Sequence, residues 1–291
     1  MGDILPPMRK KPSIAIVGAG NLGSALAASL AEAGYAVREI VYRSGGGSAA
    51  RAKKLAREIG ARAATVERAQ LDAEVIWLCV PDRQIAAAAE QLAQRREWKG
   101  RIALHSSGAL GSDELAALKR RGAFVASLHP LMTFVQGAQP ELAGVPFAVE
   151  GDSRAVKVAR AIVGDLGGEA FAIERRRKAA HHAWGGFTSP LIIAALVTAE
   201  EVARLAGQSK ASARRRMLPI VKQTIRNYEK LGAAGAFSGP IIRGDVPTVR
   251  KHLAALKKVP AAREVYLALA RMAMKSLPVG NKKELKKLLG G

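Results

Sequence analysis

Polar side chains that can move a proton or bind an anion gather in four short segments of the chain. Pro81-Asp82, His105-Ser106-Ser107-Gly108 and Ser127-Leu128-His129-Pro130 each follow an apolar run, and Lys178-Ala-Ala-His181-His182 opens a helical pattern. Imidazole, hydroxyl and ammonium groups are common donors and acceptors of protons at a reacting carbonyl. These residues therefore predict a site for a substrate that carries a carbonyl or a carboxylate.

Each of these side chains also has a plainer interpretation. A His-Pro pair at a strand end can form a structural turn, so His129 could serve the backbone instead of a substrate, and so could His105. Lys178 follows three arginines and could begin a solvated basic helix. Adjacent helical positions point in different directions, so we expect one of His181 and His182 to pack or to face solvent.

The segment Arg243-Gly244-Asp245 presents a similar choice. Asp245 could cap the helix that begins near Pro247, or the turn could bring Arg243 to an anionic substrate. The candidate substrate contacts are therefore His105, Ser106, His182 and Arg243.

A glycine-rich segment near the start of the chain indicates a nucleotide site. Gly18, Gly20, Asn21, Leu22 and Gly23 follow the first apolar run and precede a helical pattern, with a second apolar run at the distance expected for a βαβ unit. Gly18 permits a tight turn, Gly20 leaves room for a pyrophosphate, and Gly23 lets the helix pack closely on the sheet. This context favours a dinucleotide-binding fingerprint over an unrelated glycine-rich turn.

The residues after the second apolar run bear on the choice of cofactor. NAD sites usually place an acidic residue there for the ribose 2′-hydroxyl. This chain has Tyr42-Arg43-Ser44, followed by Ser48 and Arg51. Arg43 can stack on adenine and bind a 2′-phosphate, and Ser44 can donate a hydrogen bond to it. NADP is therefore favoured, the alternative being that Arg43 is a solvated loop charge.

The remaining pattern alternates strands and helices, which predicts an α/β fold with a doubly wound Rossmann-type sheet. Ligands of such a sheet bind beyond the carboxyl ends of its strands, so Val80, Pro81 and Asp82 are expected to line the cofactor, and Asp82 to cap the next helix. From Arg175 onward the pattern is almost wholly helical. We expect a nucleotide-binding domain over residues 1–174 and an all-α domain over residues 175–291. The expected strands are residues 14–17, 36–42, 75–80 (counted as the fourth), 102–105, 124–128, 146–149 and 170–173.

Composition excludes several classes of protein. Of 291 residues, 46 are basic and 24 acidic, and this net charge of +22 would attract anionic substrates. Only 4% of residues are aromatic and none interleaves with the basic patches, so we expect no specific nucleic-acid partner. The single cysteine, Cys79, offers no disulfide, and no Cys/His pattern indicates a metal site. The start of the chain does not read as a secretion signal and no long uninterrupted apolar run follows, so we expect a cytoplasmic protein without a membrane anchor.

Several segments together resemble one known family. VPDRQI, HSSGAL, SLHPLMTF, the helix from Lys178 and SGPIIRGDVPTVRKHL are similar to the Rossmann-like family whose C-terminal half is a domain of unknown function, in the 6-phosphogluconate dehydrogenase-like superfamily. The resemblance runs from about Ser13 to Leu269. Its members are often labelled NADP oxidoreductases by similarity to deazaflavin-dependent enzymes, and some resemble an alternative ketopantoate reductase. It implies an NADP cofactor and a helical domain that helps form a homodimer.

Cousin enzymes imply roles for individual residues. In β-hydroxyacid dehydrogenases a Lys-x-x-Asn-Asn helix protonates the developing alkoxide, and Lys178-Ala-Ala-His181-His182 resembles it with both Asn replaced by His. Prephenate dehydrogenase has a serine and a His-Pro at strand ends, similar to Ser107 and His129. The resemblance therefore implies Lys178, His129 and Ser107 as catalytic residues.

Three functions remain open from the sequence. The first is an NADPH-dependent reductase of a small oxo acid, such as ketopantoate, or of an imine, with hydride transfer in a cleft between the domains. The second is a regulatory or scaffolding protein that binds NADP without turnover. A basic nucleic-acid-binding protein is a more distant third.

Overall fold

The computed structural model describes residues 10–44, 47–138 and 140–290. The chain divides into two compact units, Met1–Thr188 and Ser189–Gly291. We predicted the division after residue 174, whereas the structure keeps the helix that carries Lys178 with the first unit. The reason is that the Lys178 side chain is fully buried and bonded to strand ends of that unit. The start of the chain, in which we expected no secretion signal, lies up to residue 9 outside the described residues.

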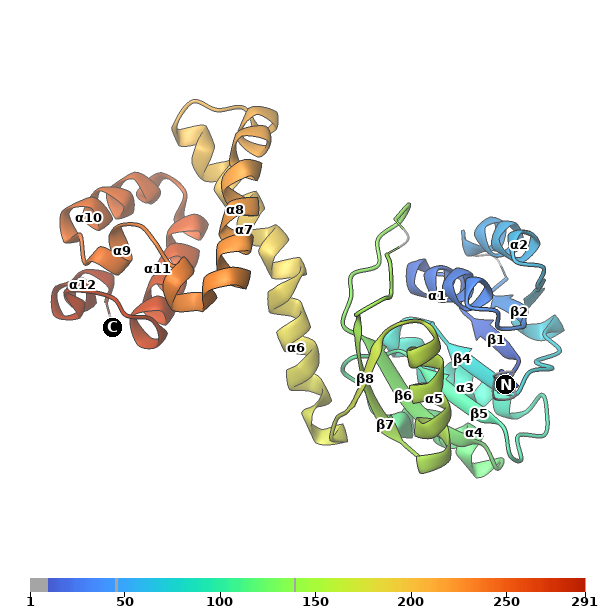
Figure 1. The fold of residues 1–291 in the computed structure, drawn as a ribbon. Coiled ribbons are helices and arrows are strands. Elements are labelled where there is room, and N and C mark those ends of the chain that lie inside the picture. Colours follow the sequence, from blue (N-terminus) through green and yellow to red (C-terminus); the bar gives the residue numbers. More distant parts are fainter. Residues whose placement is uncertain (1–9, 45–46, 139, 291) are drawn as a thin grey trace, which may run out of the picture. The chain divides into compact units, whose positions relative to one another are not determined.

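An eight-stranded sheet forms the centre of the first unit (Figure 1). The strand order is β3-β2-β1-β4-β5-β6-β7-β8, and the neighbours are parallel except for the antiparallel pair β6 and β7. This confirms the predicted α/β, Rossmann-type sheet, and β3 is the third strand, for which we predicted no bounds. The strands are β1 (Ile14–Val17), β2 (Val37–Tyr42), β3 (Arg62–Thr65), β4 (Val75–Leu78), β5 (Ile102–His105), β6 (Phe124–Pro130), β7 (Pro146–Gly151) and β8 (Glu169–Ala172).

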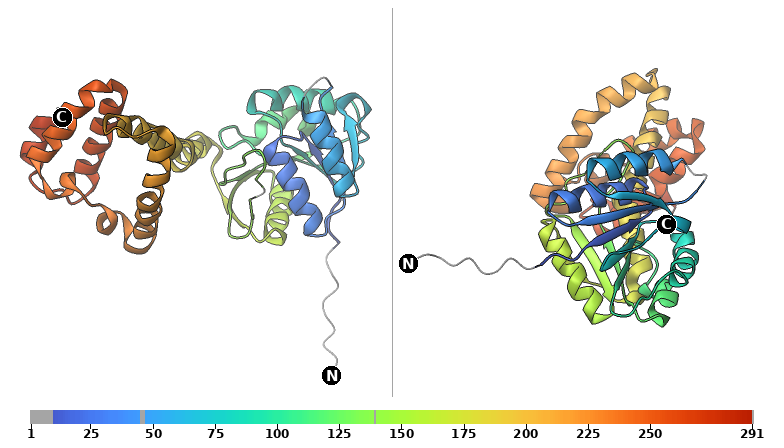
Figure 2. Two further views of the ribbon diagram at one scale, coloured as in Figure 1. Left: turned by 90° about the horizontal axis from the view of Figure 1, so that it is seen from above. Right: turned by 90° about the vertical axis from the view of Figure 1, so that its right-hand side faces the viewer.

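Helices cover both faces of this sheet (Figures 1 and 2). On one face α1, α2 and α5 pack against strand residues such as Ile16 and Trp77, and on the other α3 and α4 pack against Val17 and Ile76. Successive strand residues point to opposite faces, so a sheet covered twice needs continuous apolar runs. The helices of this unit are α1 (Asn21–Glu32), α2 (Ser48–Glu58), α3 (Ile85–Ala93), α4 (Ala116–Arg120), α5 (Ser153–Asp165) and α6 (Lys178–Thr188), with 3-10 turns at Val66–Arg68, Asp82–Gln84, Ser112–Leu115 and Arg175–Arg177.

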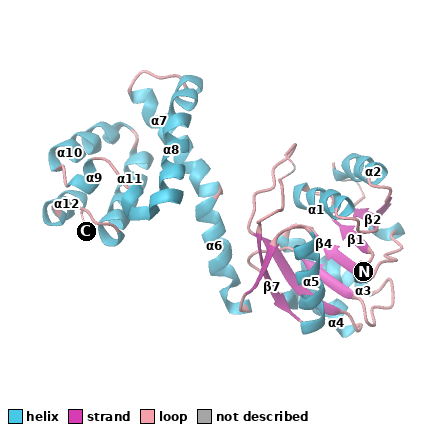
Figure 3. Ribbon diagram, viewed as in Figure 1, coloured by secondary structure: helices cyan, strands magenta, loops and turns pink. Residues whose placement is uncertain are grey.

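The described part of the second unit contains helices joined by loops and no strand (Figure 3). Its core contains Val249, Leu253, Ala270, Leu285 and Leu289. The Asp245 carboxylate accepts a hydrogen bond from the Thr248 amide at 3.1 Å, so Asp245 caps α10, which is one of the two alternatives for this segment. The elements are α7 (Pro190–Leu205), α8 (Lys210–Ala236), α9 (Pro240–Arg243), α10 (Val246–Ala255), a 3-10 turn (Leu256–Lys258), α11 (Pro260–Ser276) and α12 (Lys282–Leu289).

The helical stretch Arg175–Leu205 exposes an apolar surface. By length and composition it could cross a membrane, so the expectation that no segment resembles a span is not confirmed. Its exposed residues include Leu191, Ile193 and Val197. Length and composition alone do not separate a membrane span from a helix that packs on another chain.

Candidate active site

The glycine-rich loop after β1 has the geometry that a dinucleotide needs. Gly18 has a φ of +110°, and a Cβ there would lie 2.7 Å from the Cys79 carbonyl oxygen. A Cβ at Gly23 would lie 2.0 Å from the Gly18 carbonyl oxygen, so the helix start touches the turn. A Cβ at Gly20 would meet no atom within 4 Å. No side chain caps α1 and no acidic residue stands in its first turn, so free N–H groups face this space and fit a pyrophosphate.

A cleft of about 430 Å³ continues from this loop across the ends of β2, β3 and β4. Arg43 and Ser48 line its polar side, and Val66, Ala88 and Leu92 line its apolar side. Its shape and lining suit an adenosine moiety, with the exposed Arg43 placed at the end of β2 as predicted.

The other predicted cofactor residues hold the rim of this region. The Asn21 amide donates to the Phe134 carbonyl at 3.2 Å and accepts from the Arg51 guanidinium at 3.2 Å, while Leu22 packs on the core. Val80 and Pro81 line the cleft itself. Asn21 thus fastens the loop that follows β6, and Arg51 holds Asn21 from α2.

Asp82 differs from its predicted role as a helix cap. Asp82 is the first residue of a 3-10 turn, and α3 begins only at Ile85. Neither the turn nor the helix has a side-chain cap at its start. Instead, the Asp82 carboxylate accepts a hydrogen bond from the Ser107 hydroxyl at 2.7 Å. The prediction of a cap was wrong because a stronger partner, a hydroxyl on the neighbouring strand end, takes the carboxylate.

Lys178 lies at the centre of a buried polar cluster. Its ammonium donates to the Ser127 hydroxyl at 2.7 Å and to the Ser107 carbonyl at 2.9 Å, and the side chain is 0% exposed. Burial lowers the pKa of Lys178, and the carboxylates of Glu150 and Asp82 oppose that shift. The alternative that Lys178 begins a solvated basic helix is therefore wrong, because its ammonium lies inside the protein.

Ser107 has its hydroxyl fully engaged. It donates to Asp82 and accepts from the amides of Ala109 at 3.2 Å and Leu110 at 2.9 Å. The side chain therefore shapes the turn after β5. Its predicted catalytic role stays a prediction.

His105 and Ser106 are also bound inside the protein. His105 accepts from the Ser107 amide at Nδ1 (3.1 Å) and donates from Nε2 to the Gly111 carbonyl at 2.8 Å. Burial lowers the pKa of His105 to about 4. The Ser106 hydroxyl accepts from the Trp77 indole at 2.7 Å. Both side chains hold the turn after β5 in place. His105 thus serves the backbone in this structure, as the alternative to substrate binding predicted.

His129 has one ring nitrogen bonded inside the protein and one without a partner in the part of the chain that the structure describes. Its Nδ1 donates to the Ser106 carbonyl at 3.0 Å, which leaves Nε2 without a proton in the neutral ring. Burial first, and then the charge of Lys178, lower the pKa of His129 to about 4. Nε2 has no partner among the described residues and is not enclosed. It is therefore a free hydrogen-bond acceptor at the end of β6.

Two further imidazoles touch His129. The His181 ring lies 5.6 Å and the His182 ring 5.8 Å from it, both edge-on. As expected, one of them packs, since His181 is buried and His182 exposed, yet both reach the same ring. A Cβ at Gly108 would lie 2.7 Å from His129 Nε2 and 2.5 Å from His182 Cδ2. The missing side chain of Gly108 therefore leaves room for both rings.

Arg243 belongs to the second unit, where it is exposed at the end of α9. Its contact with a substrate stays a prediction. Among the residues that the structure describes, no group of three or more His, Cys, Asp or Glu side chains is arranged to hold a metal.

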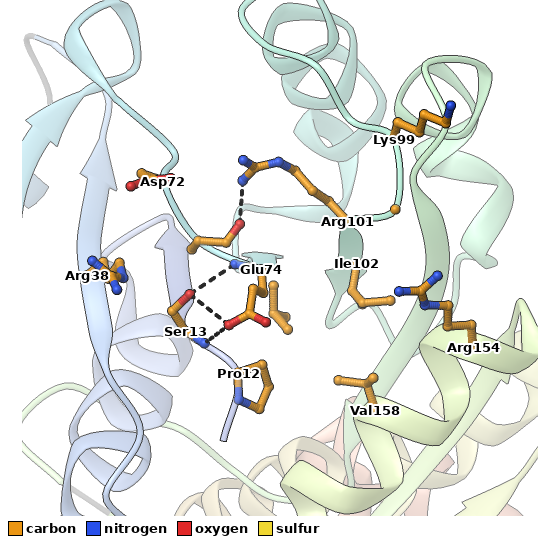
Figure 4. Close-up of a pocket in the computed structure, with 13 residues that line it drawn as sticks. Pro12, Ser13, Arg38, Asp72, Glu74, Lys99, Arg101, Ile102, Arg154 and Val158 are labelled. Carbon is orange, nitrogen blue, oxygen red and sulfur yellow. Dashed lines mark hydrogen bonds between the residues drawn. The ribbon is translucent and has the colours of Figure 1, made fainter. Parts of the chain in front are cut away.

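A second cleft, of about 520 Å³, lies at the opposite ends of the strands (Figure 4). Glu74 accepts there from the amide and hydroxyl of Ser13 at 2.9 and 3.2 Å, and Arg101 donates to the carbonyls of Leu71 and Ala73. These bonds fasten the starts of β1, β4 and β5. Ligands of this sheet type bind at the other edge, so we place the site at the carboxyl ends.

Ser127 belonged to a predicted segment but had no role of its own, and it shares a face of β6 with His129. Glu150 was not predicted. Glu150 accepts from the amide and hydroxyl of Ser112 and lies 3.5 Å from Arg175, and its place opposite Ser127 in the sheet follows from strand pairing that no local pattern contains.

Family models match both halves of the chain. A Rossmann-like domain matches residues 3–130, and a domain of unknown function, DUF2520, matches residues 145–273. The chain thus joins a Rossmann-like domain to a DUF2520 domain, as the sequence resemblance implied. No curated protein matches the sequence.

Solved structures share the fold at low identity. A Bacteroides fragilis protein provisionally assigned as an NADP oxidoreductase is 21% identical, covers 90% of this chain and 97% of its own, and has a TM-score of 0.75. Protein TM1727 of Thermotoga maritima is 24% identical with the same coverage, 90% and 97%, and a TM-score of 0.71. An Aspergillus terreus reductive aminase, solved with NADPH and ethyl-5-oxohexanoate, is 17% identical, covers 96% and 100%, and has a TM-score of 0.60.

Proposed function

We propose that this chain, which joins a Rossmann-like domain to a DUF2520 domain, is an NADPH-dependent reductase of a small C=N or C=O compound. One observation carries the proposal: Pro81 lines the nucleotide cleft, and the next residue, Asp82, is bonded to Ser107, whose carbonyl holds Lys178. The cleft and the charged cluster are thus built on neighbouring strand ends of one sheet. The likeness to NADP oxidoreductase structures supports the same activity.

The cofactor is NADP, held by the glycine loop and by Arg43. The loop and the free start of α1 would take the pyrophosphate. Arg43, which lines the cleft, and Ser44, the residue next to it, would take the 2′-phosphate. When bound, the nicotinamide supplies the hydride. Calorimetric titration should show tighter binding of NADPH than of NADH, and Arg43→Asp should abolish or reverse that preference. Equal affinities in the unmodified protein would contradict the role of Arg43.

The state of His129 favours an imine as substrate. A protonated imine carries its own N–H donor, and His129 Nε2 offers an acceptor without a proton. Such a substrate needs no acid from the protein during reduction. His129 would orient the C=N group, and the neutral ring adds no charge against the cation.

An oxo acid is the second candidate, and Lys178 is the observation that favours it. Reduction of a carbonyl places negative charge on oxygen, and a buried ammonium stabilises such charge in a site of low dielectric. The ammonium has a third N–H beyond its bonds to Ser127 and Ser107. Ketopantoate is the oxo acid that the family resemblance suggests.

A substrate screen with NADPH distinguishes these classes. Cyclic imines and 2-oxo acids should be offered to the unmodified protein and to His129→Asn, with NADPH consumption and NADPH affinity measured on the same samples. We expect turnover of one class, lowered about a hundredfold by His129→Asn with affinity retained. Tight NADPH binding without turnover of any compound would favour the regulatory or scaffolding role.

We further propose a cytoplasmic homodimer that buries the apolar surface of α7. Leu191 and Ile193 are 49% and 59% exposed there, which is unusual for large apolar side chains of a solvated helix. Ile193→Glu should lower the mass measured by light scattering. A monomeric unmodified protein at micromolar concentration would contradict the dimer.

A further inference from the structure

A carboxylate lies where the proposed cofactor carries its extra phosphate. Glu67 follows β3 in the 3-10 turn Val66–Arg68 and lines the same cleft as Gly20 and Arg43. None of the sequence patterns pointed to it, because the cofactor fingerprint covers only the ends of β1 and β2.

Glu67 is bonded to the hydroxyl that we assign to the 2′-phosphate. The Ser44 hydroxyl donates to the Glu67 carboxylate at 3.2 Å. A hydrogen bond from its own backbone, one from Thr65 and that from Ser44 lower the pKa of Glu67, so it is ionised at neutral pH. Arg95 faces it as well, but its guanidinium donates to the Glu67 backbone carbonyl and not to the carboxylate.

We infer that Glu67 is a second determinant of cofactor choice and that it acts against NADP. The inference rests on the proposed binding of NADP through Arg43 and Ser44. A carboxylate within hydrogen-bond distance of Ser44 repels a 2′-phosphate and competes with it for the hydroxyl. The same carboxylate accepts a hydrogen bond from the free 2′-hydroxyl of NAD, the role that acidic residues at the end of β2 have in NAD sites.

Arg43 and Glu67 are therefore opposing charges at one end of the cleft. Arg43 attracts the phosphate and Glu67 weakens that attraction, so the discrimination against NAD is smaller than Arg43 alone would give. Both residues are exposed. Salt screens charges in such positions, so the effect is a modest factor that shrinks as ionic strength rises.

Glu67→Gln tests the inference because the amide keeps an acceptor for Ser44 and removes the charge. Glu90→Gln, an exposed carboxylate on α3 that does not line the cleft, controls for net charge. NADPH and NADH should be titrated calorimetrically into the unmodified protein and both variants, at low and at high salt. We expect Glu67→Gln to raise the ratio of NADPH to NADH affinity about three- to tenfold at low salt, less at high salt, with no change in Glu90→Gln.

The outcomes separate this inference from the proposed function. An unchanged or lowered ratio in Glu67→Gln, or an equal rise in Glu90→Gln, overturns the role of Glu67 while NADPH binding stands. Failure of the unmodified protein to bind either cofactor contradicts the proposed function itself.

Discussion

The glycine-rich loop after β1 and the cluster of His129, His181 and His182 lie at the same edge of one sheet, at the carboxyl ends of β1 and β6, but they differ in how much free space they leave. A side chain at Gly20 would meet nothing within 4 Å, whereas one at Gly108 would collide with two imidazoles. The loop leaves backbone N–H groups free, while the Lys178 ammonium is bonded to the Ser127 hydroxyl and the Ser107 carbonyl. One region is thus built to receive a ligand, and the other to hold charges and tautomers in place before a ligand arrives.

Filling the space beside Gly20 should have the largest effect, and the effect should be on cofactor affinity. Gly20→Val places a branched side chain where the pyrophosphate would lie, and we expect NADPH and NADH affinity to fall at least about a hundredfold. Gly164→Ala is the control, since a Cβ in the last turn of α5 also meets nothing within 4 Å and does not line the cleft. Unchanged affinity in Gly20→Val would mean that the loop is misread.

Removing the ammonium of Lys178 should affect turnover and not the affinity for NADPH. Lys178→Met should lower turnover about a hundredfold while NADPH affinity survives. Because Lys178 lowers the pKa of His129 and His105, its loss should raise both pKa values in an NMR titration. Lys157→Met, on the exposed side of α5, should change neither. Normal turnover with unshifted histidines would remove Lys178 from the site.

Adding a methyl group beside His129 should lower turnover less than the loss of Lys178 does. In Gly108→Ala the added methyl lies within 2.7 Å of His129 Nε2, so the ring must move, and we expect turnover to fall about tenfold. Gly186→Ala, where a Cβ on α6 meets nothing within 4 Å, serves as control. If Gly108→Ala keeps full turnover, the position of His129 does not matter for the reaction.

These two regions also differ in how far they could be predicted from the sequence. The Gly18–Gly23 fingerprint is local, because strand, turn and helix follow one another in the chain. The Lys178 cluster joins residues about 50 and 70 positions apart, since Lys178 reaches Ser127 and Ser107. A strand-end pattern can place His129 and Ser107 at the correct edge. Only strand pairing and side-chain bonding decide that Ser107 and His105 support the loop while His129 stays open.

Acid should lower the melting temperature of the protein by a few degrees through the buried imidazole of His105. His105 has a pKa of about 4 in the folded state against an ordinary value of 6.5, so between these pH values the unfolded chain binds the proton first. The contribution of His105 to stability is therefore constant above pH 6.5 and falls as the pH drops toward 4. Thermal unfolding across that window should show the decline. His105→Gln should make the decline smaller, the remainder coming from His129, whose pKa is also lowered to about 4, while His252→Gln in the second unit should leave the decline unchanged. A flat profile in the unmodified protein would contradict the buried neutral state.

The most direct test of the account is transfer of a labelled hydride. The protein should be mixed with NADPH deuterated at the transferred position and with the imine and oxo-acid panel, and the products examined by mass spectrometry. We predict that one class of product gains a single deuterium with the unmodified protein and none with Gly20→Val. Tight binding of NADPH with no deuterium in any product would contradict the claim that these two regions form a reductase site.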